Sequence, residues 1–195
     1  MPFTPKILAF SGSSRKDSFN KKLIAVGVAA AKAAGGDVTL IDLRELELPI
    51  YDGDLEKEKG LPAGAVRLKQ LMLASHGLLI STPEYNSYFP PLVKNAIDWS
   101  SRPAPDKAIS GLTPLADKVV GIMSASPGAL GGMRSMLALR QQFSNVGTIV
   151  LPAMFSLARA DEAFDDNGGL KDEKHRASVE KLAQKLVTLA TKLHG

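Results

Sequence analysis

Residues 11–20, with the sequence SGSSRKDSFN, hold a set of side chains that could bind an anion. Ser13, Ser18 and Asn20 can hydrogen-bond to phosphate oxygens, and Arg15 adds a forked, permanently charged donor. These residue types at this spacing predict a phosphate-binding loop. A simpler interpretation is also open, in which Ser18 or Asn20 caps a helix and the other residues form a surface loop.

The flanking sequence places this loop between a strand and a helix. Residues 7–10 (ILAF) are a short apolar run, as in a buried strand. Downstream, apolar and small residues recur at helical spacing: Leu23, Val26, Gly27, Ala30 and Ala34. A loop in this position directs several backbone N–H groups and the positive end of the helix at one point, and Gly12 lets the main chain come close. We therefore expect a phosphate cradle.

Composition limits the class of protein. The chain has 195 residues, of which 45% are hydrophobic and 23% charged, so we expect residues 1–195 to form a single globular domain. It has no cysteine, which excludes disulfides, thiolate nucleophiles, cysteine-ligated zinc and iron–sulfur clusters. No segment approaches eighteen uninterrupted apolar residues, and the first residues do not resemble a signal peptide. The sequence therefore predicts a cytoplasmic protein without membrane insertion.

The basic residues are concentrated near the proposed cradle. The formal net charge is +4, but the first thirty-six residues alone carry six basic residues and one acidic residue. This asymmetry could steer a small anionic molecule. Alternatively, Lys21, Lys22 and Lys32 only form a solvated helix face. Aromatic residues make up just 6% of the chain, too few for the stacking surface of a nucleic-acid-binding protein, so we expect no nucleic-acid partner.

Apolar strand-like runs alternate with helical patterns along the whole chain. The predicted strands are residues 7–10, 38–41, 77–81, 119–123 and 148–151. Later helices are predicted at about 66–73, 92–99, 133–143 and 179–193, whereas 46–60, 101–117 and 161–169 are expected to be loops or irregular connections. This alternation predicts an α/β fold, a doubly wound five-stranded parallel sheet with helices on both faces.

The sheet topology would bring a second loop beside the cradle. In such a sheet with strand order 2-1-3-4-5, ligands bind at the switch point between strands one and three. The cradle follows strand one, and the loop with Pro83, Glu84, Tyr85 and Asn86 follows strand three. We therefore expect these two loops to lie side by side, which favours the phosphate-site interpretation over the simple cap.

Several other kinds of site are not supported by the sequence. The triphosphate motif G-x-x-x-x-G-K-[ST] is absent, and so is G-x-G-x-x-G in the first turn, so a mononucleotide phosphate is a better fit than a dinucleotide. His76, His175 and His194 show no metal-ligand spacing, so no metal is expected. We expect His76 to be a polar residue at the start of a strand, and the other two to lie on the surface of the last helix.

Three segments in this order resemble the NADPH-dependent FMN reductase family of flavodoxin-like proteins. They are GSSRKDSFN (12–20), PEYN (83–86) and KNAIDW (94–99). The similarity extends through 126–132, with Arg134 just after, and through 170–173, so it covers nearly the whole chain. It is close to the chromate and quinone reductase branch of the family.

The resemblance implies FMN as the cofactor, bound by three sets of residues. Ser13, Arg15, Ser18, Phe19 and Asn20 would hold the phosphate and the neighbouring ribityl chain. Pro83, Glu84, Tyr85 and Asn86 would line the isoalloxazine ring, and Ser126 and Gly128 would close the other edge. Trp99 is expected to be a packing residue. The chemistry would occur at flavin N5, so no protein side chain is expected to be catalytic.

The resemblance also implies an activity and a quaternary structure. NADPH or NADH would donate hydride to the flavin, which would pass electrons to a quinone or a similar small acceptor, such as free flavin, chromate or an azo compound. A homodimer or homotetramer is implied, with Arg134 and Arg140 near a subunit contact. Residues 135–138 lack the tyrosine that the resemblance would place near Arg134.

Two other functions fit the same fold. One is a flavodoxin that exchanges single electrons with protein partners, although its surface should be acidic and the sequence pI here is about 9.3. The other is a module without redox activity that binds a phosphate or a nucleotide, because fold alone does not determine function.

Overall fold

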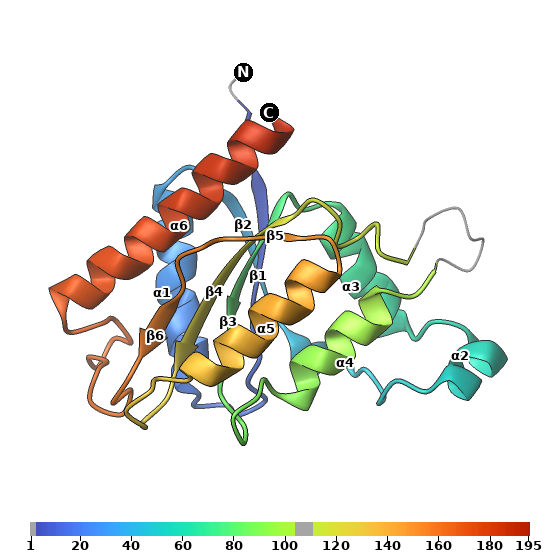
Figure 1. Cartoon of the computed structure of the whole chain (residues 1–195), viewed down its shortest axis with the longest axis horizontal. Helices are drawn as coiled ribbons and strands as arrows, with labels where there is room; N and C mark the ends of the chain where they lie inside the picture. Colours follow the sequence, from blue (N-terminus) through green and yellow to red (C-terminus); the bar gives the residue numbers. More distant parts are fainter. Residues whose placement is uncertain (1–2, 104–110) are drawn as a thin grey trace.

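The computed structural model describes residues 3–103 and 111–195 (Figure 1). Its elements in chain order are β1 (Lys6–Ser11), α1 (Phe19–Ala33), β2 (Asp37–Asp42), the 3-10 helix η1 (Leu43–Leu46), α2 (Gly53–Lys59), α3 (Ala63–Leu73), β3 (Gly77–Ser81), α4 (Pro91–Ser100), β4 (Val119–Ala125), α5 (Met133–Asn145), β5 (Ile149–Val150), β6 (Phe155–Leu157) and α6 (Glu173–His194). Residues 104–110 of the predicted connection at 101–117 lie outside the described residues.

The strands form a parallel sheet in the order β2-β1-β3-β4-β5, which confirms the predicted flavodoxin-like topology. The predicted number of five strands was wrong. Within the described residues the sheet has six, because β6 also pairs with β4, with Phe155 opposite Met123. The predicted fifth strand at 148–151 is reduced to two residues. Pro152 follows it and has no N–H to donate to the ladder, so the pairing breaks and resumes three residues later.

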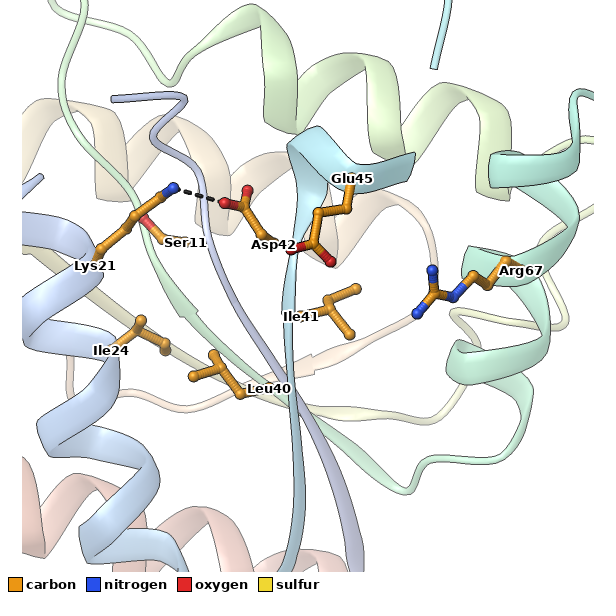
Figure 2. Close-up of a pocket in the computed structure, with 8 residues that line it drawn as sticks. All are labelled: Ser11, Lys21, Ile24, Leu40, Ile41, Asp42, Glu45 and Arg67. Carbon is orange, nitrogen blue, oxygen red and sulfur yellow. Dashed lines mark hydrogen bonds and ion pairs between the residues drawn. The ribbon is translucent and has the colours of Figure 1, made fainter. Parts of the chain in front are cut away.

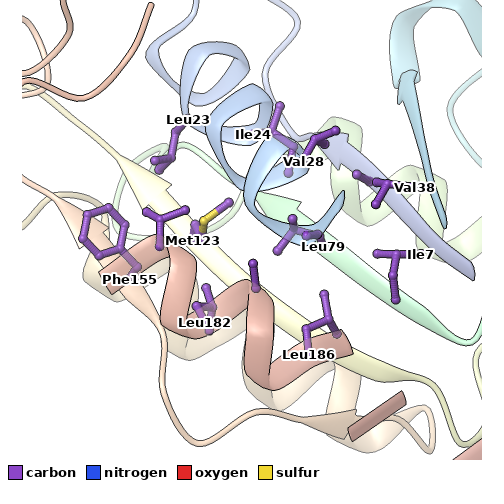
Figure 3. Packing of buried hydrophobic residues seen from close by; sticks show 14 of the residues in the cluster. Ile7, Leu23, Ile24, Val28, Val38, Leu79, Met123, Phe155, Leu182 and Leu186 are labelled. Carbon is purple, nitrogen blue, oxygen red and sulfur yellow. The ribbon is translucent and has the colours of Figure 1, made fainter. Parts of the chain in front are cut away.

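Alternate residues of each strand face opposite layers of helices. Ile7, Leu79 and Met123 pack under α1 and α6, as Figure 3 shows, together with Leu23 of α1 and Leu186 of α6. Residues of the other parity pack under η1, α3, α4 and α5; these include Leu8, Phe10, Leu78, Ile80, Val120 and Ile122. Both faces of the sheet are covered, which explains why its central strands read as continuous apolar runs.

The segment 46–60 was predicted to be a loop, but it contains the short helix α2. Asp52 is its N-cap and accepts hydrogen bonds from the backbone N–H groups of Asp54 (2.8 Å) and Leu55 (3.3 Å). The Tyr51 hydroxyl donates to Glu56 at 3.0 Å. No residue of α2 is buried, so the helix has no apolar periodicity from which it could have been predicted.

Folding brings two of the three histidines together. The rings of His76 and His194 lie 5.1 Å apart, and Nδ1 of His76 accepts a hydrogen bond from the Lys6 backbone N–H at 2.8 Å. His175 packs edge-on against Phe155. His175 and His194 are therefore half-buried rather than on the open surface, because their helix lies across the sheet.

The described residues contain neither a metal-binding cluster nor a helix that could span a membrane. Within residues 3–103 and 111–195, no three histidine, aspartate or glutamate side chains are grouped so that they could hold a metal ion. No helix in the same ranges is both long and apolar enough to cross a membrane.

Candidate functional site

A cleft of about 280 Å³ lies at the carboxyl ends of β1, β3 and β4. It is lined by Ser13, Arg15, Ser18, Phe19, Asn20, Pro83, Glu84, Tyr85, Ala125, Ser126 and Pro127. Nine of the eleven residues proposed from the sequence are in this set. The parallel topology brings them together, because the loops after adjacent strands leave the sheet at the same edge.

The loop after β1 begins with a close approach to neighbouring elements. The backbone N–H of Gly12 donates to the carbonyl of Ser81 at 2.9 Å, which continues the β1–β3 ladder by one bond. A Cβ atom at Gly12 would lie 2.5 Å from Val93 of α4, closer than real side chains pack. Only glycine fits here, so the loop starts at a fixed point between β3 and α4.

Three serine hydroxyls in the cleft share one arrangement. Ser13 accepts a hydrogen bond from the Arg15 N–H (3.3 Å), Ser18 from the Asn20 N–H (3.1 Å), and Ser126 from the Gly128 N–H (3.2 Å). Ser18 is thereby the N-cap of α1, as the simpler interpretation of the loop predicted. No hydrogen bond donated by these hydroxyls is found in the described part of the chain, so their protons are available to an acceptor.

The rest of the loop also offers donors. In the described ranges, the backbone N–H groups of Ser14, Lys16, Asp17 and Ser18 have no acceptor. The Arg15 guanidinium donates once, to the Asp17 carbonyl at 3.1 Å, and lies 5.5 Å from the centre of the Phe19 ring. A loop with hydroxyl, amide and guanidinium donors at the start of α1 is suited to a dianionic phosphate.

Asn20 lines the cleft and also makes several hydrogen bonds within the protein. It is buried, and its side-chain amide both donates to the Ala125 carbonyl (2.8 Å) and accepts from the Ala125 N–H (2.9 Å). The Ser81 hydroxyl donates to the same oxygen of Asn20 at 2.9 Å. Asn20 therefore joins the first turn of α1 to the ends of β3 and β4, and only one of its N–H groups is left for a ligand.

Glu84 connects the second loop to α5. Its carboxylate accepts hydrogen bonds from the backbone N–H groups of Arg134 (3.1 Å) and Ser135 (3.4 Å), and from Nε of Arg134 (2.7 Å). The N-cap residue of α5 is Gly132, at φ 84°, which has no side chain to cap the helix. Glu84 supplies the missing acceptor from another part of the chain, so it positions the loop as well as lining the cleft.

Asn86 and Gly128 do not line the cleft. Asn86 and Ser87 have φ angles of 50° and 68°, and the backbones of Tyr85 and Tyr88 exchange hydrogen bonds of 2.8 and 3.1 Å. Two consecutive positive φ angles across such a pair are the mark of a tight type I′ turn, for which asparagine is well suited. Asn86 thus shapes the loop that presents Tyr85.

Three residues of this region were not identified from the sequence. Ala125 and Pro127 line the cleft, and Ser81 supports it through Asn20. Alanine and proline carry no reactive group, and a serine at the end of a strand is common, so none of them gives a signal in the sequence.

A neighbouring cavity of about 320 Å³ lies beside the edge strand β2 (Figure 2). It contains none of the eleven proposed residues. Lys21 and Asp42 point toward one another across it, with 2.6 Å between Nζ and Oδ2. Partial burial acts to raise the pKa of Asp42, but hydrogen bonds from Lys21 and from the Arg44 backbone outweigh it and hold that pKa below its usual value. Lys21 is therefore committed to an ion pair, not free to bind a phosphate.

The KNAIDW segment has a structural role. Asn95 accepts a hydrogen bond from the Tyr51 N–H (2.8 Å) and donates to the Pro49 carbonyl (2.7 Å). The indole N–H of Trp99 donates to the same carbonyl at 2.8 Å, and the side chain is fully buried. The prediction that Trp99 is a packing residue is confirmed: α4 holds the chain that leads into α2.

Comparisons with known proteins identify the family to which the chain is similar. Residues 5–162 match the NADPH-dependent FMN reductase family. An NAD(P)H-dependent FMN reductase of Pseudomonas aeruginosa is 33% identical over 192 residues, 97% of each chain. A quinone reductase of Escherichia coli is 38% identical over 137 residues, 70% of this chain and 68% of the relative.

A solved structure of a flavoenzyme is also similar to this chain over nearly its whole length. A flavoenzyme NAD(P)H:(acceptor) oxidoreductase from Paracoccus denitrificans superposes with a TM-score of 0.79 at 29% identity, covering 97% of this chain and 98% of that one. The family match and the similar proteins show the family, and the parallel sheet with its donor-rich cleft is consistent with it. The chain belongs to the NADPH-dependent FMN reductase family.

Proposed function

We propose that this protein binds FMN in the cleft at the ends of β1, β3 and β4 and uses it to oxidise NADPH or NADH. The observation that carries this proposal is the convergence of the three loops on one cleft whose polar groups are mainly hydrogen-bond donors. The phosphate end is assigned to Ser13, Arg15 and Ser18, with Phe19 and Asn20 beside them.

The ring would lie against the second and third loops. Pro83 and Tyr85 of the second loop and Ser126 and Pro127 of the third loop all line the cleft. When bound, FMN accepts a hydride and passes the electrons on to a second substrate. The chain holds the phosphate, fixes both loops through Asn20 and Glu84, and leaves room for the substrates at the open mouth, where Tyr85 is 45% exposed.

The acceptor that we propose is a quinone. The similarity to proteins named quinone reductases supports it, as does the partly exposed aromatic ring of Tyr85 at the cleft, which can stack on a flat molecule. Free flavin, chromate and azo compounds are the alternative acceptors. We place the reaction in the cytoplasm, on the basis of family membership.

An anaerobic titration tests the proposal against a flavodoxin-like electron carrier. The visible absorption of the FMN-loaded protein should bleach with about one NADPH per FMN, and added quinone should restore it. A flavin that remains oxidised with both NADPH and NADH, but accepts single electrons from a reductase protein, would establish the carrier instead. A colourless protein whose melting temperature is unchanged by FMN would support the module without redox activity.

We also propose a homodimer or homotetramer. The region around the cleft exposes apolar side chains that a second copy could cover: Tyr88, Leu130, Met133 and Leu137. Arg134 and Arg140 lie on the same helix, but Arg134 is paired with Glu84 and Arg140 donates to the Leu151 and Pro152 carbonyls of its own chain. Light scattering that reports a monomer over a wide concentration range would rule the oligomer out.

A further inference from the structure

A groove separate from the flavin cleft lies between α6 and the segment that joins β5 to β6. It has a volume of about 400 Å³, within the range of small-molecule sites. Its lining residues are Pro152, Ala153, Met154, Phe155, Ser178, Lys181, Leu182 and Lys185. Figure 1 shows this joining segment running alongside α6 before it turns into β6. No residue of the groove lines the flavin cleft.

The groove follows from the interruption of the last strand. Pro152 cannot donate to the ladder, so the chain leaves β4 after Leu151 and pairs with it again at Phe155. Among the described residues, the interruption leaves the carbonyls of Leu151 and Pro152 without a strand partner. The Arg140 guanidinium donates hydrogen bonds to both, at 2.6 and 2.7 Å. Here the edge of the sheet is not completed by a strand, and a space remains beside α6.

The walls of the groove are mainly apolar. Met154, Phe155 and Leu182 contribute thioether, aromatic and aliphatic surface, and Pro152 and Ala153 extend it along the joining segment. Phe155 and Leu182 are buried, whereas Pro152 and Ala153 are solvent-exposed and Met154 is half-buried, so these last three residues supply most of the accessible apolar surface. A ligand with an aliphatic or aromatic group would cover this apolar surface and remove it from water.

The charged groups of the groove are all positive. Lys181 and Lys185 stand one turn apart on α6, and neither ammonium has a carboxylate partner among residues 3–103 and 111–195. The lining contains no acidic residue. In the described chain the backbone N–H groups of Ala153 and Met154 also have no acceptor. Two like charges at i and i+4 repel each other, and an anion between them relieves the repulsion.

We propose that this groove is a second ligand site, which binds an amphipathic carboxylate: a molecule with an apolar body and one anionic head. The body lies against Met154, Phe155 and Leu182, and the head lies between Lys181 and Lys185. A neutral apolar molecule would leave the two ammonium groups unpaired, and an inorganic anion would leave the apolar wall uncovered. The combination of the two surfaces selects a ligand that has both features.

Calorimetric titration of the FMN-loaded protein tests this site with two probes of the same chain length and opposite charge, decanoate and decylammonium. Decanoate should bind with one molecule per chain and at least about fivefold more tightly than decylammonium, because two exposed charge pairs together contribute on the order of 1 kcal/mol. The double variant Lys181→Gln/Lys185→Gln should remove most of this difference. Met154→Gln should weaken both probes, since it removes only apolar surface.

The matched control is Lys57→Gln/Lys59→Gln on α2, which makes the same change in net charge at exposed positions outside the groove. It should bind decanoate like the parent protein. The inference is overturned if the two double variants bind decanoate equally well, or if decanoate and decylammonium bind the parent alike. FMN content and NADPH oxidation, measured on the same samples, report on the proposed function separately, because none of these residues touches the cleft.

Discussion

Asn20 and Ala125 are 105 positions apart in the sequence, yet the amide side chain of one pairs with the backbone of the other in both directions, at 2.8 and 2.9 Å. Both residues line the cleft, and the pair joins the first turn of α1 to the end of β4. It fixes the distance between the loops that follow β1 and β4, which under our proposal contact the same cofactor. Asn20, Ser81 and Ala125 therefore form one buried hydrogen-bond network that sets the spacing of the loops around the cleft.

The first prediction concerns this pair. Asn20→Ala should lower the free energy of unfolding of the protein without FMN by about 2–4 kcal/mol, because the Ala125 N–H and the Ser81 hydroxyl lose a buried acceptor. Urea denaturation gives the value. Asn145→Ala, at an exposed position on α5, is the control and should change it little. If Asn20 acted only through FMN, the unfolding of the FMN-free protein would be unaffected.

The second prediction concerns Arg15. Arg15→Ala should weaken FMN binding by about 1.5–3 kcal/mol, or roughly tenfold to a hundredfold, because a charged donor to the phosphate is lost. The fold should be unaffected, since Arg15 is exposed and makes one hydrogen bond within its own loop. Fluorescence titration with FMN measures the dissociation constant. Lys16→Ala removes the same charge one residue away, outside the cleft, and should have a much smaller effect; equal losses in both variants would mean that Arg15 has no specific contact.

The third prediction separates the two roles of Glu84. Glu84→Ala should destabilise the protein by about 1–2 kcal/mol, because the N-terminus of α5 loses its only side-chain acceptor in the described structure. Arg134→Ala should cost less, because the backbone hydrogen bonds to Glu84 remain and the lost ion pair is partly exposed. Thermal melts of the two variants measure the order. A larger loss for Arg134→Ala would show that the ion pair, not the helix cap, holds the loop.

The fourth prediction is a pH dependence at His76. Burial, with the nearby charges of His194, Lys118 and Lys6, lowers the pKa of His76 below its ordinary value of 6.5. Protonation would also remove the acceptor of the Lys6 N–H. Below pH 6.5 the unfolded chain therefore binds more protons at this site than the folded chain, so stability falls as the pH decreases from 6.5 to the lowered pKa.

The variant His76→Gln tests that dependence. Its free energy of unfolding, measured by urea titration at several pH values, should change less across this window than that of the parent. Asp172, whose pKa is lowered by hydrogen bonds from the backbone of His175 and Lys174, titrates at lower pH and should contribute equally to both proteins. Parallel curves for the two proteins would exclude His76 as the source.

The topology and the meeting of the loops after β1 and β3 could be predicted from local patterns in the sequence, whereas Ser126 was expected only from the family resemblance. Apolar runs such as 77–81 mark buried strands, and strand order then brings the loops after β1 and β3 together. Strand β6 could not be predicted, because it is only three residues long and such a short segment shows no clear periodicity. Helix α2 was missed although its cap, Asp52, is visible in the sequence, because it buries no apolar face.

The roles of individual polar residues were harder to predict. Asn20 and Glu84 have the residue types of ligand-binding side chains, but their partners lie 105 and 50 positions away. A sequence shows that a donor or acceptor exists, not which group will satisfy it. Ser18 was ambiguous for the same reason, and in the structure it both caps α1 and lines the cleft.

The break at Pro152 also affects how the protein behaves at high concentration. An unbroken edge strand exposes a row of N–H and C=O groups that can recruit a strand from another molecule and start a fibril. On this side the row is divided into pieces of two and three residues, β5 and β6, which is too short to act as a template. The opposite edge, β2, is six residues long, but an aspartate stands at each end of it. We therefore expect the sheet to resist edge-to-edge pairing between molecules, because one edge is interrupted and the other carries charged residues.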